Sequence, residues 1–306
     1  MRASDITLSR NLSFLFKGPF GHGKTLAAAS FALEGPVYIF YWDKKSPIEL
    51  VTYFSKFGEL GQKILRNIEY DVYGAHNANE YLNKVIHMGK DCRYIAVITD
   101  SLTQMTSGAV NWSLSFRDDR KNKDKLKVIP DFDEYKVETS LVTQALDVFR
   151  TMPCHVIWTA HPVPSIKIEG SGSSIKITKT QPLVTYGSKV AGIVPGNFSE
   201  IYHFAKLSAW DSNAGKSITK YNASFDAIGD DFAKSNMGLT GELDFTNELF
   251  YSIWKARVDQ HRKEIDDALL KQKQAVTPSP FIFTETVTEQ KPETTKIWNS
   301  AKGAYE

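Results

Sequence analysis

Residues 12–25, LSFLFKGPFGHGKT, carry the most informative pattern in the chain. The first six residues are a short apolar run, which is typical of a strand buried on both faces. Residues 18–25 match the pattern G-x-x-x-x-G-K-[ST], in which glycines let successive backbone N–H groups surround a phosphate. The Ala/Leu-rich residues 25–33 predict a helix. The stretch therefore predicts a phosphate-binding loop between a strand and a helix.

This loop predicts a site for a nucleoside triphosphate and Mg²⁺. Lys24 is expected to reach the β- and γ-phosphates, and the Thr25 hydroxyl is expected to coordinate Mg²⁺. The alternative is a glycine turn that only connects a strand to a helix. The residues expected to contact the nucleotide are Gly18, Pro19, Phe20, Gly21, His22, Gly23, Lys24, Thr25 and Leu26.

Acidic residues follow two further apolar runs. Residues 94–99 end at Asp100, which is predicted to hold Mg²⁺ through water. An Asp that caps the following helix is the structural alternative. Residues 37–42 end at Asp43, a candidate general base for the attacking water and equally a solvated loop acid. Glu49 is a weaker candidate for the same role.

A histidine follows a third run. Residues 155–160, HVIWTA, predict a buried strand, and His161 comes directly after it. A polar side chain at this position can form a hydrogen bond with the γ-phosphate and report hydrolysis to the adjoining loop. The alternative is a structural histidine.

Apolar runs alternate with segments of helical periodicity, which predicts an α/β fold with a mostly parallel central β-sheet flanked by helices. Residues 163–190 predict a hairpin or mobile loop, and residues 108–131 show no periodicity. We predict a core over residues 1–262, then a helix end and flexible tail over 263–306. Strands are predicted at 12–17, 37–42, 68–73, 94–99, 155–160, 199–208 and 216–224, the last two antiparallel, and helices at 25–33, 77–89, 133–152 and 247–270.

Composition excludes several classes of protein. The chain has 306 residues, 42% of them hydrophobic, which excludes wholesale disorder and fibrous repeats. The net charge of +2 provides no global basic field for nucleic acid. Two cysteines form no disulfide framework. No apolar run approaches the roughly 20 residues that span a bilayer, and the first residues lack a secretory signal pattern. These features predict a cytoplasmic protein without membrane contact.

The order of these motifs resembles the RecA-like P-loop ATPase core. It is most similar to phage Sak-type single-strand annealing ATPases, which are also called phage nucleotide-binding proteins. The resemblance covers roughly residues 10–250. It is carried by GPFGHGKT (18–25), VYIFYWDKK (37–45), AVITDSLT (96–103), VIWTAHP (156–162), VPGNFSEIYHF (194–204) and DDFAKSNMGL (230–239).

The resemblance implies subunit assembly, in a ring or a filament, with ATP at the interface between subunits. Lys234 matches a lysine that reaches into the neighbouring subunit's site, whereas Asn236 stands where this family usually has arginine. An amide cannot supply the charge of a guanidinium. Activation across the interface would therefore rest on Lys234, and a solvated loop lysine is the alternative.

The resemblance also implies two loops that bind single-stranded DNA, in the cytoplasm of a bacterial host if the protein is phage-encoded. In the segment 109–127, aromatic rings that can stack on bases alternate with cations, and three acids dilute the charge. The segment 167–189 is basic and rich in glycine and serine. Both have a solvated surface loop as the alternative. The candidates are Trp112, Phe116, Arg117, Arg120, Lys121, Lys123, Lys125 and Lys127 in the first, and Lys167, Lys176, Lys179 and Lys189 in the second.

The function expected from the sequence is Mg²⁺- and ATP-dependent DNA binding in phage-type recombination, single-strand annealing or replication. A single-strand-binding protein is a possible partner of the C-terminal tail. One alternative is a nucleotide-gated DNA-binding or assembly module with little turnover. The other is a nucleotide kinase, with residues 109–127 as a basic lid. A GTPase is excluded, because the nearest approach to its base-reading motif, at residues 122–125, ends in lysine and no Asp-x-x-Gly follows the run at 94–99.

Overall fold

The computed structural model describes residues 11–43, 47–116, 129–163, 165–169, 176–180, 183–211, 215–227, 233–275, 298–299 and 304–305. The chain divides into two compact units, residues 1–261 and 262–306. All the predicted site residues belong to the first unit.

A mixed β-sheet forms the centre of the first unit. Its order is β11-β9-β8-β1-β5-β4-β2-β3, and β10 pairs with β8. The six strands from β8 to β3 are parallel, whereas β9, β10 and β11 are antiparallel. The predicted α/β class with a mostly parallel sheet is confirmed. The strands are β1 Ser13–Lys17, β2 Val37–Tyr41, β3 Ile68–Val72, β4 Ala96–Asp100, β5 His155–Ala160, β8 Glu200–Asp211, β9 Lys216–Ser224, β10 Lys234–Ser235 and β11 Glu242–Asp244.

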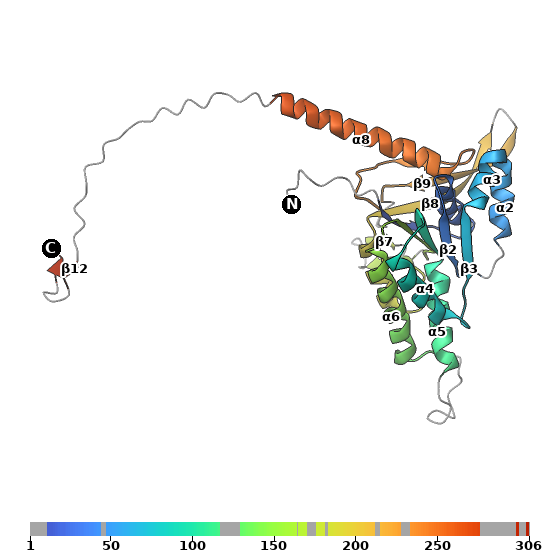
Figure 1. Cartoon of the computed structure of the whole chain (residues 1–306), viewed down its shortest axis with the longest axis horizontal. Helices are drawn as coiled ribbons and strands as arrows, with labels where there is room; N and C mark the ends of the chain where they lie inside the picture. The colour runs from blue at the N-terminus through green and yellow to red at the C-terminus, as the bar shows by residue number, and fades with distance from the viewer. Residues whose placement is uncertain are drawn as a thin grey trace. The chain divides into compact units, whose positions relative to one another are not determined.

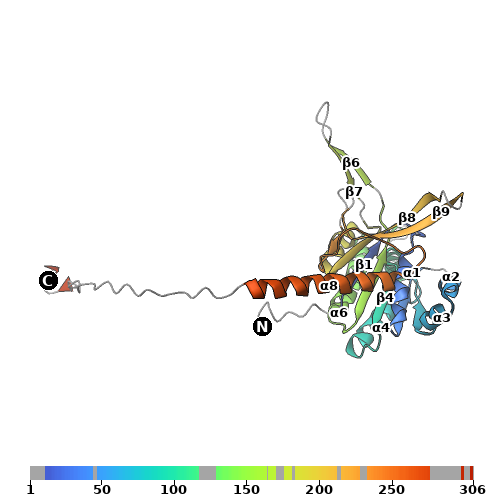
Figure 2. The same cartoon turned by 90° about the horizontal axis from the view of Figure 1, so that it is seen from above.

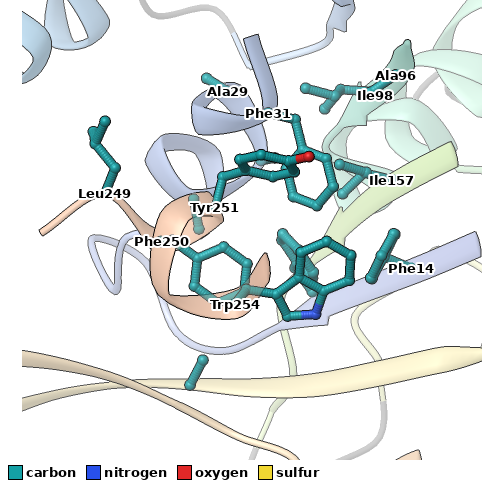
Figure 3. Close-up of a cluster of buried hydrophobic side chains, with 14 of the residues drawn as sticks. Phe14, Ala29, Phe31, Ala96, Ile98, Ile157, Leu249, Phe250, Tyr251 and Trp254 are labelled. Atoms are coloured by element: carbon teal, nitrogen blue, oxygen red, sulfur yellow. The ribbon is translucent and has the colours of Figure 1, made fainter. Parts of the chain in front are cut away.

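One face of the sheet packs against α1 (Lys24–Ala29), α2 (Ile48–Phe54), α3 (Gly58–Arg66) and the first turns of α8 (Phe250–Ala275). Phe14 and Phe16 of β1 point to this face, because side chains alternate along a strand. Figure 3 shows the aromatic centre of this layer, where the ring centroids of Phe14 and Trp254 lie 5.4 Å apart. Those of Phe31 and Tyr251 are 4.7 Å apart. Phe31 lies in the short 3₁₀ turn Ser30–Leu33 that continues α1, so this contact helps to hold α1 and the glycine-rich loop before it against the sheet.

The other face of the sheet packs against α4 (Ala78–Lys90), α5 (Leu102–Ser115), α6 (Phe132–Phe149) and α7 (Ser188–Ile193). Leu15 of β1 points to this side, as do Val97 of β4 and Trp158 of β5. Figure 1 shows α4, α5 and α6 side by side on this face. Both faces of β1, β4 and β5 are therefore covered, which explains their unbroken apolar runs.

Two antiparallel hairpins extend from this core. The strands β6 (Ser165–Glu169) and β7 (Lys176–Thr180) pair with each other and project away from the sheet (Figure 2). The long strands β8 and β9 pair from His203–Ser224 to Asp211–Lys216. Both hairpins agree with the sequence predictions. A further short pair joins β12 (Trp298–Asn299) to β13 (Ala304–Tyr305) in the second unit.

Helix α5 corrects the sequence prediction. Residues 108–131 were expected to be irregular, but 108–115 complete a helix that begins at Leu102. Ser101 caps this helix by accepting a hydrogen bond from the Gln104 N–H. Its buried face includes Ala109 and also Gly108, whose lack of a side chain lets the helix approach the Trp42 ring closely. Small residues of this kind contribute little to a hydropathy pattern, so the helix was missed.

Helices α2 and α3 also lie in a region that the sequence analysis left unassigned. None of the helices in the described part of the chain combines the length and the apolar character that crossing a membrane requires.

Candidate nucleotide-binding site

The glycine-rich loop lies between β1 and α1, as predicted. Gly21 and Gly23 have φ angles of 73° and 85°, which favour glycine because other residues meet a steric penalty there. Gly18 is required for another reason, since a Cβ atom on it would lie 2.3 Å from the carbonyl oxygen of Phe204. The loop geometry therefore depends on glycine at all three positions.

Lys24 is buried beneath this loop. Its ammonium group donates hydrogen bonds to the carbonyl oxygens of Gly18 at 2.7 Å and Pro19 at 2.8 Å. It also lies 3.2 Å from Nδ1 of His161, which can accept a hydrogen bond from it in the Nε2-protonated tautomer. The positive charge is thus held at the centre of the loop, where the expected phosphates would bind.

Asp100 ends β4 within reach of two hydroxyl groups. The Thr25 hydroxyl donates to Oδ2 at 2.8 Å, and the Thr159 hydroxyl donates to Oδ1. Burial raises the pKa of Asp100, while the two hydroxyls and the charge of Lys24 act in the opposite direction. A cation bound nearby would further stabilise this buried carboxylate. Its peptide bond to Ser101 is cis.

These residues fit Mg²⁺ in the manner of a nucleotide site. Thr25 and Asp100 offer two adjacent oxygens, of the ligand type that Mg²⁺ prefers. In the part of the chain that the structure describes, no three His, Cys, Asp or Glu side chains gather around a common point. The protein would therefore supply few ligands, and phosphate oxygens and water would supply the rest.

His161 lies between the loop and the second layer of the structure. The Phe20 ring stacks on its imidazole with centroids 3.7 Å apart. The backbone N–H of His161 donates a hydrogen bond to the Thr103 hydroxyl of α5 at 3.3 Å, and the backbone carbonyl of His161 accepts one from the Val184 N–H at 2.7 Å. Movement of His161 would therefore be transmitted to α5 and to the segment that follows the β6–β7 hairpin.

His22, at the tip of the loop, attaches it to β8. Its Nδ1 accepts a hydrogen bond from the Lys206 N–H at 3.1 Å and lies 3.2 Å from the Phe204 carbonyl oxygen. Burial lowers the pKa of His22, although the Phe204 carbonyl opposes this, and the nearby cation of Lys24 lowers it further. The neutral imidazole, which can accept from Lys206, is thereby favoured.

A cavity of about 220 Å³ opens in front of the loop. Asp43 borders it and is half-buried after β2. Glu49 also borders it, but its carboxylate accepts a hydrogen bond from the Tyr41 hydroxyl at 2.9 Å. Both acids therefore face the cavity, as a general base must. The lining comprises Phe20, Gly21, His22, Gly23, Lys24, Thr25, Leu26, Asp43, Glu49, Asp100, His161 and Tyr221.

Lys234 is not part of this cavity. It pairs with Ile201 near the start of β8, whereas the phosphate loop follows the opposite end of the neighbouring strand. Its ammonium group donates to the Phe198 carbonyl oxygen of its own chain at 3.1 Å. The buried carboxylate of Glu200 holds the adjoining turn by accepting from the Met237 N–H at 3.2 Å. A role for Lys234 in a neighbouring subunit's site stays a prediction.

The predicted DNA-binding residues are described only in part. Trp112 lies on helix α5 and is half-buried, with its ring 5.2 Å from that of Phe116. It therefore belongs to a helix rather than to the expected loop. Lys176 and Lys179 lie on β7. Arg117, Arg120 and Lys121 lie outside the described residues.

Sequence reasoning missed two residues of this site. Thr159 holds the second oxygen of Asp100, and its signal was a hydroxyl residue inside an otherwise apolar strand. Tyr221 of β9 lines the cavity, and a Cβ on Gly23 would lie 3.3 Å from its ring. Nothing in the sequence around Tyr221 indicates this contact, because the pairing of β8 with β1 creates it.

Neither a protein-family model nor a curated protein sequence matches the chain.

Proposed function

We propose that the chain is a Mg²⁺-dependent ATPase with a RecA-like core that couples ATP to single-stranded DNA. One observation carries the proposal. Side chains from three adjacent parallel strands and their connections, Lys24, Asp100 and His161, converge on one glycine-rich loop. Ligands of open parallel sheets commonly bind at this edge, outside the carboxyl ends of the strands.

The arrangement supports phosphoryl transfer to water. Lys24 would neutralise charge on the β- and γ-phosphates, and the backbone N–H groups of the loop would orient them. Thr25 and Asp100 would hold Mg²⁺, which neutralises phosphate charge when bound. Asp43 would orient the attacking water, and His161, which also lines the cavity, would contact the γ-phosphate.

Two observations favour a second candidate, a nucleotide-gated assembly module with little turnover. The Glu49 carboxylate already accepts a hydrogen bond from the Tyr41 hydroxyl, and Asp100 is assigned to Mg²⁺. Among the acids that line the cavity, this leaves Asp43 to orient the attacking water. Lys234 donates to its own chain, and Asn236 replaces the arginine expected from the resemblance. Both features would slow hydrolysis without preventing ATP binding.

ATP binding and hydrolysis, measured with and without single-stranded DNA, test these proposals. The wild type is compared with Lys24→Ala and with Lys56→Ala, which removes an exposed lysine far from the loop in sequence. We expect Lys24-dependent turnover that DNA raises several-fold, with Lys56→Ala unchanged. Turnover that depends on Lys24 but not on DNA would favour a nucleotide kinase and call for nucleoside monophosphate acceptors.

Two other outcomes are decisive. ATP binding that depends on Lys24 without turnover would replace the ATPase proposal by the nucleotide-gated module. Equal ATP binding by wild type and Lys24→Ala would show that the loop at residues 18–25 does not bind the nucleotide.

A further inference from the structure

The two cysteines of the chain are neighbours in space. Cys92 follows α4 and Cys154 directly precedes β5, 62 residues later. The Sγ atoms lie 3.4 Å apart. A disulfide bond requires about 2.05 Å, so an approach of somewhat over 1 Å would join them. Because β4 and β5 are hydrogen-bonded neighbours, the fold itself maintains this proximity.

The two thiols differ in environment. Cys154 is 3% exposed within the core, whereas Cys92 is half-buried at its margin. The hydrogen bond with Cys154 lowers the pKa of Cys92 to about 7, although burial and the nearby Asp91 oppose this. The same contact, together with burial, raises the pKa of Cys154. Of the two thiols, Cys92 is therefore the one that loses its proton more readily.

A small oxidant has access to the pair. Cys92 is partly exposed to solvent. A cavity of about 260 Å³, bordered by Leu12, Arg150 and Asn197, also reaches Cys154. A reactive thiolate that is accessible and adjacent to a second thiol is the arrangement found in redox-sensitive cysteine pairs.

We propose that Cys92 and Cys154 form a peroxide-sensitive modification site, at which oxidation joins their sulfurs in a reversible disulfide bond. The Cys92 thiolate attacks hydrogen peroxide, so an S–O bond forms and the O–O bond breaks. The departing hydroxide takes up a proton and leaves as water, and Cys92 becomes a sulfenic acid. The Cys154 sulfur then attacks the Cys92 sulfur, the S–S bond forms, and the oxygen leaves as a second water with the thiol proton.

The modification would act on the stability of the sheet. The disulfide would close a loop of 62 residues that contains β4, α5 and α6. Closing a long loop restricts the unfolded chain, which stabilises the folded one. The cysteines lie before the amino ends of β4 and β5, and Asp100 and His161 lie at the carboxyl ends. The proposal therefore does not rest on the proposed function of the phosphate loop.

The test exposes the reduced full-length chain to a small molar excess of hydrogen peroxide. The chain is then unfolded, and its free thiols are alkylated and identified by mass spectrometry. We expect the wild type to lose both alkylatable thiols together, to become two hydrogen atoms lighter and to yield a cross-linked peptide pair. Dithiothreitol should restore both thiols. The thermal midpoint should rise on oxidation by on the order of 5 °C.

Two single variants separate the roles of the cysteines. Cys154→Ser should accumulate a sulfenic acid at Cys92 that dimedone traps, and Cys92→Ser should leave Cys154 open to alkylation. Cys154→Ala, which removes the hydrogen bond to Cys92, should give the same dimedone adduct more slowly, and it serves if the serine variant does not fold. The proposal is overturned if wild-type Cys92 gains oxygen while Cys154 stays free, if the chains cross-link to each other, or if neither thiol reacts.

Discussion

Replacing Asp100 with asparagine should lower the activity of the chain without lowering its free energy of unfolding. Burial raises the pKa of Asp100, so the ionised carboxylate costs more in the folded chain than in the unfolded one. The stabilising contribution of the protonated acid is complete below its unfolded pKa and is lost as the pH rises through its folded pKa. At neutral pH, removing the charge therefore favours folding.

The hydrogen bonds set the opposing cost. Asparagine keeps one acceptor oxygen for one of the two threonine hydroxyls, and its amide can donate to the other. A hydrogen bond to a charged group contributes about 1.5–3 kcal/mol, and a neutral one about 1 kcal/mol, so the two bonds together weaken by about 2 kcal/mol. The effective desolvation penalty of a buried ion is several kcal/mol. The free energy of unfolding without metal should thus stay unchanged or rise, by up to about 2 kcal/mol.

Activity should change in the opposite direction. If Asp100 holds Mg²⁺ at the phosphates, losing its charge should lower ATP turnover about 10²–10³-fold, the typical effect of removing one electrostatic contact from a transition state. Mg²⁺ and ATP at 100 times the dissociation constant should stabilise the wild type by about 2.7 kcal/mol, and the variant by much less.

Urea unfolding followed by tryptophan fluorescence, at pH 7 in EDTA and again with Mg²⁺ and ATP, measures both effects. Asp71→Asn is the matched control. Its carboxylate pairs with Lys84 and is partly exposed, so we expect a loss of under about 1 kcal/mol and normal turnover. A loss above about 1 kcal/mol for Asp100→Asn in EDTA, or turnover within a few-fold of wild type, would refute the reasoning.

Three further predictions concern the fold. Gly18→Ala should lower the free energy of unfolding by about 2 kcal/mol or more, because its Cβ would lie 2.3 Å from a carbonyl oxygen. Gly192→Ala meets no atom within 4 Å and should be neutral or stabilising in the same urea titration. Burial raises the pKa of Glu138 from 4.5 to about 6, so about 2 kcal/mol of stability should be lost as the pH rises from 4.5 through 6. Glu138→Gln should flatten that pH profile, and an unchanged slope would count against it. Trp254→Phe and Tyr202→Phe both remove the 3.1 Å hydrogen bond from the Trp254 indole N–H to the Tyr202 hydroxyl, and Tyr202→Phe also removes the bond from that hydroxyl to Glu200. A double-mutant cycle, which cancels the Glu200 bond, should give about 1 kcal/mol of coupling, whereas purely additive losses would argue against the Trp254–Tyr202 bond.

The sequence predicted those features that depend on local pattern. The run at 94–99 and the run at 155–160 indicated strands, because both faces of β4 and β5 are covered and only apolar side chains fit there. The glycine-rich loop between β1 and α1 was recognisable because its conformation demands glycine at fixed positions. Asp100 and His161 could be placed together because parallel strands end at one edge of a sheet.

Long-range features were not predictable in this way. Glu138 and Glu200 are both buried, and their carboxylates accept hydrogen bonds from backbone N–H groups that lie 48 and 49 residues away for Glu138 and 37 residues away for Glu200. The order of the strands is also absent from the local pattern. For the same reason, the contact of Tyr221 with the phosphate loop, which requires β8 beside β1, could not be read from the sequence.

The resting position of Lys24 has a consequence for which anions the loop can capture. Its ammonium group already donates hydrogen bonds to two carbonyl oxygens, so an incoming anion must displace these hydrogen bonds in order to bind Lys24. A weakly charged oxyanion gains little from that exchange. A polyphosphate with a bound cation gains more, since it engages the loop backbone, Thr25 and Lys24 at once. If the loop binds phosphates as proposed, it would therefore favour highly charged anions that reach all of these groups, and free phosphate should compete poorly with a nucleoside triphosphate.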